Sequence, residues 1–330
     1  AETRARGNCN FPHNSIMIQT TVGGSLGETD DDLRWLVDYI QTNDPDGEGY
    51  YQAYTHIAPD ETIMEETDEE HFYQIGGATI FDNNGVKELQ MLWGEIDNHE
   101  GKMTRTGTCL AVYSLEGQPG NSTYLKRISK NEEFNTDDVG YGSTIWKDED
   151  GHIYLYVTEN NRPLVARTTT HDLTSEWEYY IRDLSGNFMW QKMYPTKEER
   201  TRSTIMENNY VCSMPQIFKK GDYYYMIGQA VSYGHSVYLY RGETPYGPFT
   251  DQKILFNVPY SVDKIGNQYY KNLLRVNLHL ELAREGELVF STNTDADTAG
   301  DNFDFPGSAD FCRPYFYRIF NWESIYDEDD

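Results

Sequence analysis

Short runs of alternating apolar and polar residues, rich in Tyr, Val, Ile and Phe, recur along this chain, and tight turns join them in pairs. The clearest pair spans residues 210–229, with the turn sequence KKGD around Gly221 between its halves. Aromatic and β-branched residues favour strands, and a glycine turn reverses the chain, so this stretch predicts a β-hairpin. The same pattern predicts three further hairpins, at residues 77–93, 143–158 and 278–292.

The turn glycines of these hairpins, Gly85, Gly151, Gly221 and Gly286, recur at intervals of 66, 70 and 65 residues. A repeat of this length is typical of one four-stranded propeller blade with its loops, and the chain holds about five such repeats. Third strands are predicted at 108–114, 164–168, 236–241 and 315–320, and fourth strands at 123–128, 176–181 and 253–256. We therefore predict an all-β, single-domain, five-bladed β-propeller. An all-β sandwich with a chance spacing is the alternative.

Residues 1–70 carry no clear copy of the repeated hairpin. Strands are predicted there at 14–21 and 50–57, and residues 30–42 space their apolar positions as one helix face. We expect the first blade to be irregular or incomplete, or to be closed by strands from both ends of the chain, which removes exposed sheet edges. The four recognisable blades then fall within residues 71–330.

The formal net charge is −27, from 54 acidic and 27 basic residues. Such a surface repels nucleic acid and anionic membranes, so neither is an expected partner, although it could hold divalent cations. No apolar run is long enough to predict membrane insertion. The start, AETRARGNC, fits a mature chain after signal-peptide removal, and a secreted location, extracellular or periplasmic, is expected.

The four cysteines, Cys9, Cys109, Cys212 and Cys312, are widely separated and include no C-x-x-C pair. A structural zinc site therefore has no local signature, and both disulfides, in any of three pairings, and free thiols stay open. Phosphate-binding glycine loops, G-x-S-x-G and H-E-x-x-H are also missing from the sequence, which gives nucleotide, serine-esterase and zinc-protease functions no support.

In a propeller the innermost strands start at one face of the central channel, so the residues at these starts converge on one funnel. Counting back from the turn glycines predicts the starts at Gly77, Ser143, Ser213 and Leu278. The surrounding side chains that we expect at the funnel are Gln74, Tyr141, Gln216, His279 and Glu281.

Segments 143–156 (STIWKDEDGHIYLY), 213–226 (SMPQIFKKGDYYYM) and 244–249 (TPYGPF) resemble the five-bladed glycoside hydrolases of family 43 and its relatives. The C-terminal segments 277–293 and 312–319 resemble bacterial propeller domains of unknown function, some of which act as endo-D-arabinanases. The resemblance implies a carbohydrate-active propeller that acts on a polysaccharide or oligosaccharide and requires no cofactor. It carries more weight for the fold than for the chemistry.

Two positions depart from the family 43 pattern. Ser213 stands where the general acid is expected, and Ser143 stands where the preceding blade would carry an acid. Glycosidases normally need two carboxyl groups, and a carboxyl in an aromatic-walled pocket can have a raised pKa. The candidate catalytic acids are therefore other residues. Three lie at strand ends, each with a solvated turn position as its alternative: Glu95, Asp97 and Glu159. The fourth is Glu281, expected on an inner strand beside His279.

Several polar and aromatic residues are candidate substrate-binding groups. Arg313 could form a forked pair with a carboxylate, either of the protein or of an acidic sugar. His279 resembles the channel histidine of the related hydrolases, which can bind a water or a calcium ion, and a structural histidine is the alternative. The remaining candidates could hydrogen-bond to or stack on a sugar: Gln74, Trp93, Tyr141, Ser143, Ser213, Gln216 and Asn293.

The acidic segment at residues 293–304 resembles a calcium-binding loop, with Asp295, Asp297 and Asp301 as candidate ligands. Ala299 stands where an EF-hand needs an oxygen ligand, so only a looser calcium site is predicted. The function expected first is a glycoside hydrolase. A non-catalytic glycan-binding or surface-assembly propeller is the second hypothesis, and a protein-interaction platform is the third.

Overall fold

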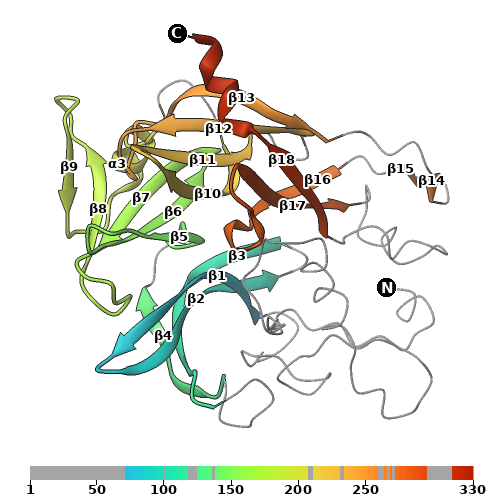
Figure 1. The fold of residues 1–330 in the computed structure, drawn as a ribbon. Coiled ribbons are helices and arrows are strands. Elements are labelled where there is room, and N and C mark those ends of the chain that lie inside the picture. Colours follow the sequence, from blue (N-terminus) through green and yellow to red (C-terminus); the bar gives the residue numbers. More distant parts are fainter. Residues whose placement is uncertain are drawn as a thin grey trace, which may run out of the picture.

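The computed structural model describes residues 71–99, 102–117, 125–135, 138–206, 211–230, 234–258, 264–265, 268–269, 272–295 and 314–329. They form an all-β propeller built from antiparallel sheets (Figure 1). The predicted helix at 30–42 and the predicted strands at 14–21 and 50–57 lie outside these residues.

The strands of four larger sheets pair in chain order, and we call these sheets blades A to D. Blade A holds β1 (His71–Asn83), β2 (Val86–His99), β3 (Lys102–Ser114) and β4 (Arg127–Asn135). Blade B holds β5 (Thr144–Lys147), β6 (Ile153–Glu159), β7 (Arg162–Thr168), β8 (Trp177–Arg182) and β9 (Phe188–Gln191). Blade C holds β10 (Cys212–Lys220), β11 (Tyr223–Gln229), β12 (Ser236–Gly242) and β13 (Thr250–Asn257). Blade D holds β16 (Asn272–Leu278), β17 (Glu287–Asp295) and β18 (Pro314–Phe320).

Short elements complete the described structure. They are the helix α3 (Lys197–Arg202), the strand pair β14 (Lys264–Ile265) and β15 (Gln268–Tyr269), and the 3-10 helices η2 (Leu280–Leu282) and η5 (Trp322–Asp329).

The innermost strands β1, β5, β10 and β16 lie next to one another in that order. The Gly77 amide donates to the Gly142 carbonyl at 2.8 Å, and Lys147 reaches the carbonyl of Ile80 at 2.9 Å. Both strands therefore advance in the same direction, as the inner strands of a propeller do. Thr144 Oγ1 donates to the Pro215 carbonyl at 2.6 Å, which continues this arrangement from blade B to blade C.

Three predicted hairpins are confirmed by the pairing of β1 with β2, β5 with β6 and β10 with β11. At the fourth turn glycine β16 pairs with β17, but β16 lies before the predicted span 278–292 and only ends at Leu278. Their turn glycines have positive φ, 90° at Gly85 and 96° at Gly151 for example, where a side chain would be strained. The described residues form four blades rather than the five predicted. Blade B has a fifth strand, β9, and the fourth strand of blade A runs from Arg127 to Asn135 rather than from 123 to 128.

Two predicted strand starts are wrong. Gly77 lies within β1, which begins at His71. Leu278 ends β16 rather than beginning it, because η2 lengthens the connection between β16 and β17. Residues counted back from Gly286 therefore lie at the far end of the inner strand.

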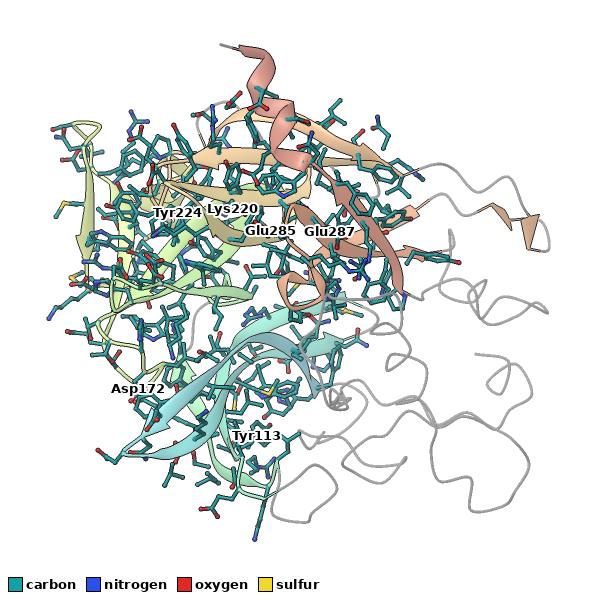
Figure 2. The ribbon with its side chains drawn as sticks, in the orientation of Figure 1. Tyr113, Asp172, Lys220, Tyr224, Glu285 and Glu287 are labelled. Atoms are coloured by element: carbon teal, nitrogen blue, oxygen red, sulfur yellow. The ribbon has the colours of Figure 1, made fainter. Side chains whose placement is uncertain are left out.

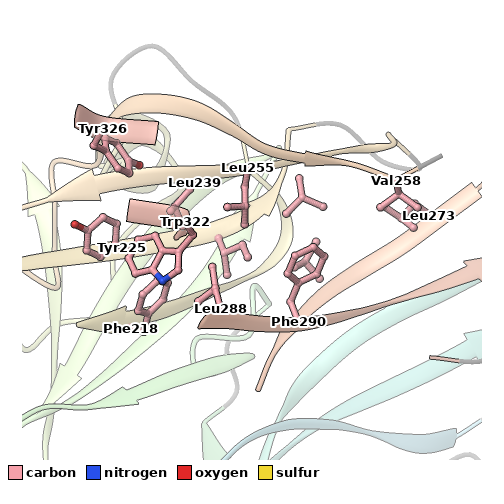
Figure 3. Packing of buried hydrophobic residues seen from close by; sticks show 13 residues of the cluster. Phe218, Tyr225, Leu239, Leu255, Val258, Leu273, Leu288, Phe290, Trp322 and Tyr326 are labelled. Carbon is pink, nitrogen blue, oxygen red and sulfur yellow. The ribbon is translucent and has the colours of Figure 1, made fainter. Parts of the chain in front are cut away.

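Buried apolar clusters join adjacent blades. Leu92 of blade A packs with Leu155 of blade B, and Tyr156 of blade B packs with Met226 of blade C. Between blades C and D, Leu239 and Leu288 share a cluster with Trp322 and Tyr326 of η5, which the close view in Figure 3 shows. The 3-10 helix η5 thus packs against blade C and contributes to the core between blades C and D.

Polar contacts also tie the blades together. Gln90 of β2 is 2% exposed, and its side chain donates to Asp172 at 2.8 Å and accepts from the Leu173 amide at 2.9 Å. Tyr224 of blade C donates to the buried Asp148 of blade B at 2.8 Å. Figure 2 labels Asp172, which bonds blade B to blade A, and Tyr224, which bonds blade C to blade B.

Candidate functional site

In every blade the first, innermost strand begins at the same end of the propeller, and the second strand, which is antiparallel to it, finishes there. We call this end the entry end. Glu95 lies there, because β2 pairs it with Tyr73 close to the start of β1. Glu159 ends β6, and Asn293 lies near the end of β17, paired with Leu274. The structure thus brings these three predicted residues to the same end of the propeller.

Glu95 has an environment unusual for a carboxylate. Its Oε1 atom is buried and has no hydrogen-bond partner. Burial raises the pKa of Glu95, and although the nearby His71, Lys130 and Arg105 act to lower it, the pKa stays above its ordinary value. A carboxyl of this kind holds its proton to a higher pH than a solvated one, as a general acid must.

Gly107 makes room for this carboxyl group. It is the β3 partner of Glu95, and a Cβ atom at this position would lie 3.0 Å from Glu95 Oε2. A side chain at Gly107 would therefore push on the carboxyl group. The close approach gives a physical reason for glycine in the middle of this strand.

Glu132 on β4 is the ionised counterpart of Glu95. Lys130 Nζ lies 2.6 Å from Glu132 Oε1, and the Tyr73 hydroxyl donates to the same oxygen at 2.9 Å. The hydrogen bonds from Lys130 and Tyr73 lower the pKa of Glu132, and the charge of Glu132 adds to the rise in the pKa of Glu95. Burial and the bond to Glu132 raise the pKa of Tyr73 to about 12. Two carboxyl groups close together thus differ in their tendency to hold a proton.

Asp97 lies two residues after Glu95 on β2, so both side chains point to the same face of blade A. Its Oδ1 is 2.8 Å from His71 Nδ1, and both side chains are partly exposed. Residues two apart in a strand have Cα atoms about 7 Å apart. This face of blade A therefore presents two carboxyl groups and an imidazole together.

Trp93 and Cys109 form the floor beneath Glu95. Both are 0% exposed and belong to one apolar cluster with Tyr73 and Met91. The predicted stacking role of Trp93 does not agree with this burial, because its ring presents no face to a ligand. The buried Nε1 of Trp93 has no hydrogen-bond partner, and neither does the buried Oδ1 of Asn98. A buried donor and a buried acceptor on β2 thus have no hydrogen-bond partner.

Glu159, predicted as a catalytic acid, is engaged in an ion pair. Both of its oxygens accept from Arg200 of α3, each at 3.1 Å, and the Arg200 side chain is only 4% exposed. Arg200 also donates to the Pro195 carbonyl at 3.0 Å. The end of β6 meets the segment that connects blades B and C, so Glu159 fixes α3 in place rather than facing solvent.

His279 and Glu281, predicted beside the funnel, follow the end of β16 and lie at the opposite end from Glu95. His279 Nε2 is 2.8 Å from Ser291 Oγ, and its ring lies against Phe316. Burial acts to raise the pKa of Glu281, but hydrogen bonds, foremost that with His279, lower it overall. Glu281 therefore stays ionised and does not suit the role of an acid.

The other predicted residues have varied positions. Tyr141 is 1% exposed and packs against Tyr179 and Tyr194, and Ser143 Oγ donates to the Gly140 carbonyl at 2.8 Å, so both serve local structure. Three are partly exposed on strands: Gln74, Gln216 and Asn293. Outside the described residues lie Arg313, Asp297 and Asp301 and the side chains of Ser213 and Asp295.

No group of three or more His, Cys, Asp or Glu side chains suited to a metal ion occurs among the described residues. None of the helices described is long and apolar enough to span a membrane.

Lys130 and Glu132 are the site residues that the sequence analysis missed. Both lie in the run RISKNEEFN of β4, where alternation places them on one face of the strand. The predicted fourth strand ended at residue 128, before either residue is reached. A strand placed over 127–135 would have brought both residues onto the same blade as Glu95.

Comparisons with known proteins identify the family of this chain and a solved structure of high sequence identity. A family profile described as a domain of unknown function (DUF5005) matches residues 1–322. A Bacteroides ovatus protein described as a "putative hydrolase" is 53% identical, with a TM-score of 0.81 over 100% of this chain and 81% of that one. No curated protein matches.

Two solved glycosidase structures are similar at a much lower level. The GH43 protein BlXynB of Bacillus licheniformis is 12% identical, with a TM-score of 0.38 over 76% of this chain and 43% of that one. An exo-β-1,3-galactanase of Phanerochaete chrysosporium, solved with β-1,3-galactotriose, is 12% identical, with a TM-score of 0.37 over 75% of this chain and 46% of that one. Neither similarity is close enough to transfer an activity.

Proposed function

The chain belongs to the family described as a domain of unknown function (DUF5005), and on that premise we propose that it hydrolyses glycosidic bonds of a polysaccharide or oligosaccharide. The description of the 53% identical Bacteroides ovatus protein as a "putative hydrolase" supports a hydrolytic reaction. The resemblance of the blade sequences to propeller glycosidases supports a sugar substrate. Glu95 is the general acid in this proposal, and Asp97 is the second carboxylate.

One observation carries the proposal: the buried carboxyl of Glu95 has a raised pKa while its neighbour Glu132 has a lowered one. Pairs of carboxyl groups whose environments separate their pKa values are typical of acid–base sites. Glu95 in its protonated form donates its proton to the leaving glycosidic oxygen. Glu132 stays ionised, and its charge helps to keep the proton on Glu95.

Asp97 completes the chemistry as the base. Its carboxylate removes a proton from the water that attacks the sugar. Two carboxyl groups about 6.5–9.5 Å apart leave room for that water and favour inversion at the sugar carbon.

A glycan-binding propeller without catalysis is the second candidate. It is favoured by the serines at positions 143 and 213, where the resembling hydrolases carry acids. Ser143 donates to the Gly140 carbonyl and so serves a turn. Under this alternative, Glu95 binds a sugar hydroxyl and breaks no bond.

Two wider features are part of the proposal. The complete propeller has five blades, as the repeat length of the sequence predicts. The protein acts outside the cytoplasm, in the periplasm or the extracellular space, because a polymeric sugar does not cross a membrane unaided. Fractionation of the native host with an antibody to this chain tests the location.

The decisive experiment measures reducing ends released from arabinan, xylan and β-1,3-galactan. The wild-type protein is expected to act on at least one of them, and Glu95→Gln to lower the rate by roughly 100-fold or more, because proton transfer from a positioned acid contributes about 10²–10⁴-fold. Glu88→Gln is the matched control, since Glu88 lies on the same strand β2 in an exposed pair with Asn83. Equal rates for wild type and Glu95→Gln would remove Glu95 as the acid. Retention of polysaccharide binding without any release of reducing ends would favour the second candidate.

A further inference from the structure

A cleft of about 450 Å³ lies on blade C, away from Glu95. Its walls come from the start of β11, the end of β12, the start of β13 and the connection between β12 and β13. Tyr223 pairs with Lys220 at the end of the inner strand β10, whereas Glu95 pairs with Tyr73 near the start of β1. Because the inner strands run parallel, the cleft and the entry end are on opposite ends of the propeller. Blade C is labelled through its strands in Figure 1.

Arg241 and Asp251 form the polar floor of this cleft. Arg241 Nη2 donates to Asp251 Oδ2 at 2.8 Å, and both side chains are about 30% exposed. The guanidinium lies 4.7 Å from the ring centre of Tyr223 and 4.6 Å from that of Tyr326, so two rings hold it in one orientation. Tyr326 also appears in Figure 3, on η5. The planar guanidinium and the carboxylate are thus fixed side by side, and each retains hydrogen-bonding capacity.

The backbone at this place is irregular. The pairing of β12 with β13 shifts register between Leu239 and Arg241, and Asp251 has a φ of 52°. Irregularities of this kind re-aim side chains and are common next to binding sites. Here they bring Asp251 to the guanidinium instead of leaving it in a regular ladder.

The charges of the lining indicate what the cleft can bind. Asp251 pairs with Arg241 at 2.8 Å and with Lys253 at 3.7 Å, and the exposed carboxylate of Glu243 lies in the wall, so two cations face two carboxylates. An anionic ligand would meet two carboxylates, and a cationic ligand would meet the guanidinium. A neutral ligand with many hydroxyl groups can donate hydrogen bonds to the carboxylates and accept them from the arginine, and it meets no charge repulsion from either. The volume falls within the range of small-molecule sites, roughly 300–1,000 Å³.

Tyr223 supplies the apolar part of the lining. It is 39% exposed, so its ring presents an accessible surface beside the polar floor. Pro248, also exposed, lies in the wall as well. An aromatic ring next to groups that bind vicinal hydroxyls matches the two kinds of surface of a sugar ring, one apolar and one polar.

We propose that this cleft on blade C is a second, non-catalytic binding site for a neutral saccharide unit. It would hold a polysaccharide chain on the side of the propeller opposite to Glu95. The site goes beyond the proposed hydrolysis and does not require it, because a glycan-binding protein without catalysis could use the same cleft.

The experiment is native gel electrophoresis in gels that contain arabinan, xylan or β-1,3-galactan, with a gel free of polysaccharide as the reference. Wild-type protein is expected to be retarded by at least one polymer. Tyr223→Ala and Asp251→Asn are each expected to raise the apparent Kd at least about tenfold, whereas Tyr223→Phe, which keeps the ring, retains wild-type retardation. Circular dichroism of each variant verifies the fold, and the exposed position of Tyr223 makes its replacement compatible with folding.

Glu95→Gln separates this proposal from the proposed hydrolysis. It is expected to remain retarded while its release of reducing ends falls by roughly 100-fold or more, and Tyr223→Ala is expected to cleave short oligosaccharides at the wild-type rate. Unchanged retardation of both Tyr223→Ala and Asp251→Asn would overturn the second site, and so would a wild-type protein that none of the three polymers retards. Either result leaves the role of Glu95 to be judged by its own rate measurement.

Discussion

Replacing Glu159 by glutamine tests whether this carboxylate serves stability rather than chemistry. Arg200, with only 4% of its side chain exposed, makes both of its bonds to Glu159 at 3.1 Å. Removing one partner of a buried ion pair costs about 3–5 kcal/mol, because the other charge remains buried. Glu159 is 20% exposed, and Arg200 keeps the Pro195 carbonyl and, at 3.4 Å, Asp138. We therefore expect a smaller loss, about 2–3 kcal/mol.

Urea unfolding followed by tryptophan fluorescence gives the measurement. Glu176→Gln is the matched control, because Glu176 pairs with Lys192 at 2.6 Å while the two side chains are 51% and 63% exposed. An exposed pair of this kind contributes about 0–1 kcal/mol. The expected result is a clear fall of the unfolding midpoint for Glu159→Gln alone, with hydrolysis retained where the variant is folded. Equal midpoints for the two variants, or a folded Glu159→Gln that lacks activity, would refute this interpretation.

Three further predictions concern other buried groups. Glu95→Gln is expected to be more stable than wild type at pH 8. A carboxyl whose folded-state pKa is raised favours folding below its unfolded-state pKa, and this contribution is lost as the pH rises through the folded-state pKa. Urea unfolding midpoints of both proteins at pH 4 and pH 8 test this, and an equal difference between the two proteins at both pH values would contradict it. Burial raises the pKa of Cys109 to about 12, so iodoacetamide at pH 8 is expected to label its peptide only in urea, and mass spectrometry that finds native labelling would disprove this. Gln90→Leu is expected to lower the free energy of unfolding by about 1–3 kcal/mol, because Asp172 and the Leu173 amide lose their hydrogen bonds to the Gln90 side chain. Calorimetry should show a lower Tm for this variant than for the control Gln191→Leu, whose lost bond to Met193 is exposed.

The fold was predictable to the extent that local chemistry determines it. The turn glycines needed positive φ, and the alternation of apolar residues set the strands on either side, so the hairpins could be placed from sequence. The start of β16 could not be placed in this way, because η2 enters between the strand and its turn. Counting backwards from Gly286 assumes a tight turn, and a short helix breaks that assumption.

The site was less predictable, because it depends on which side chains face one another across strands. Glu95 and Asp97 were found as acids near the end of a strand. The neighbouring residues Lys130 and Glu132 belong to a fourth strand whose register only the structure gives. Glu159 was predicted as a catalytic acid because it too lies at a strand end. The sequence did not show that the buried Arg200 of α3 lies beside it and makes it an ion-pair partner.

The most direct test is an NMR titration of the glutamate side chains with ¹³C-labelled carboxyl groups, with Glu95→Gln and Glu132→Gln used to assign the two signals. The account predicts a midpoint for Glu95 above its ordinary value of 4.5 and a midpoint for Glu132 below it in the same sample. A Glu95 signal that titrates at or below 4.5 would contradict the account, because the carboxyl would then hold no proton to donate at neutral pH.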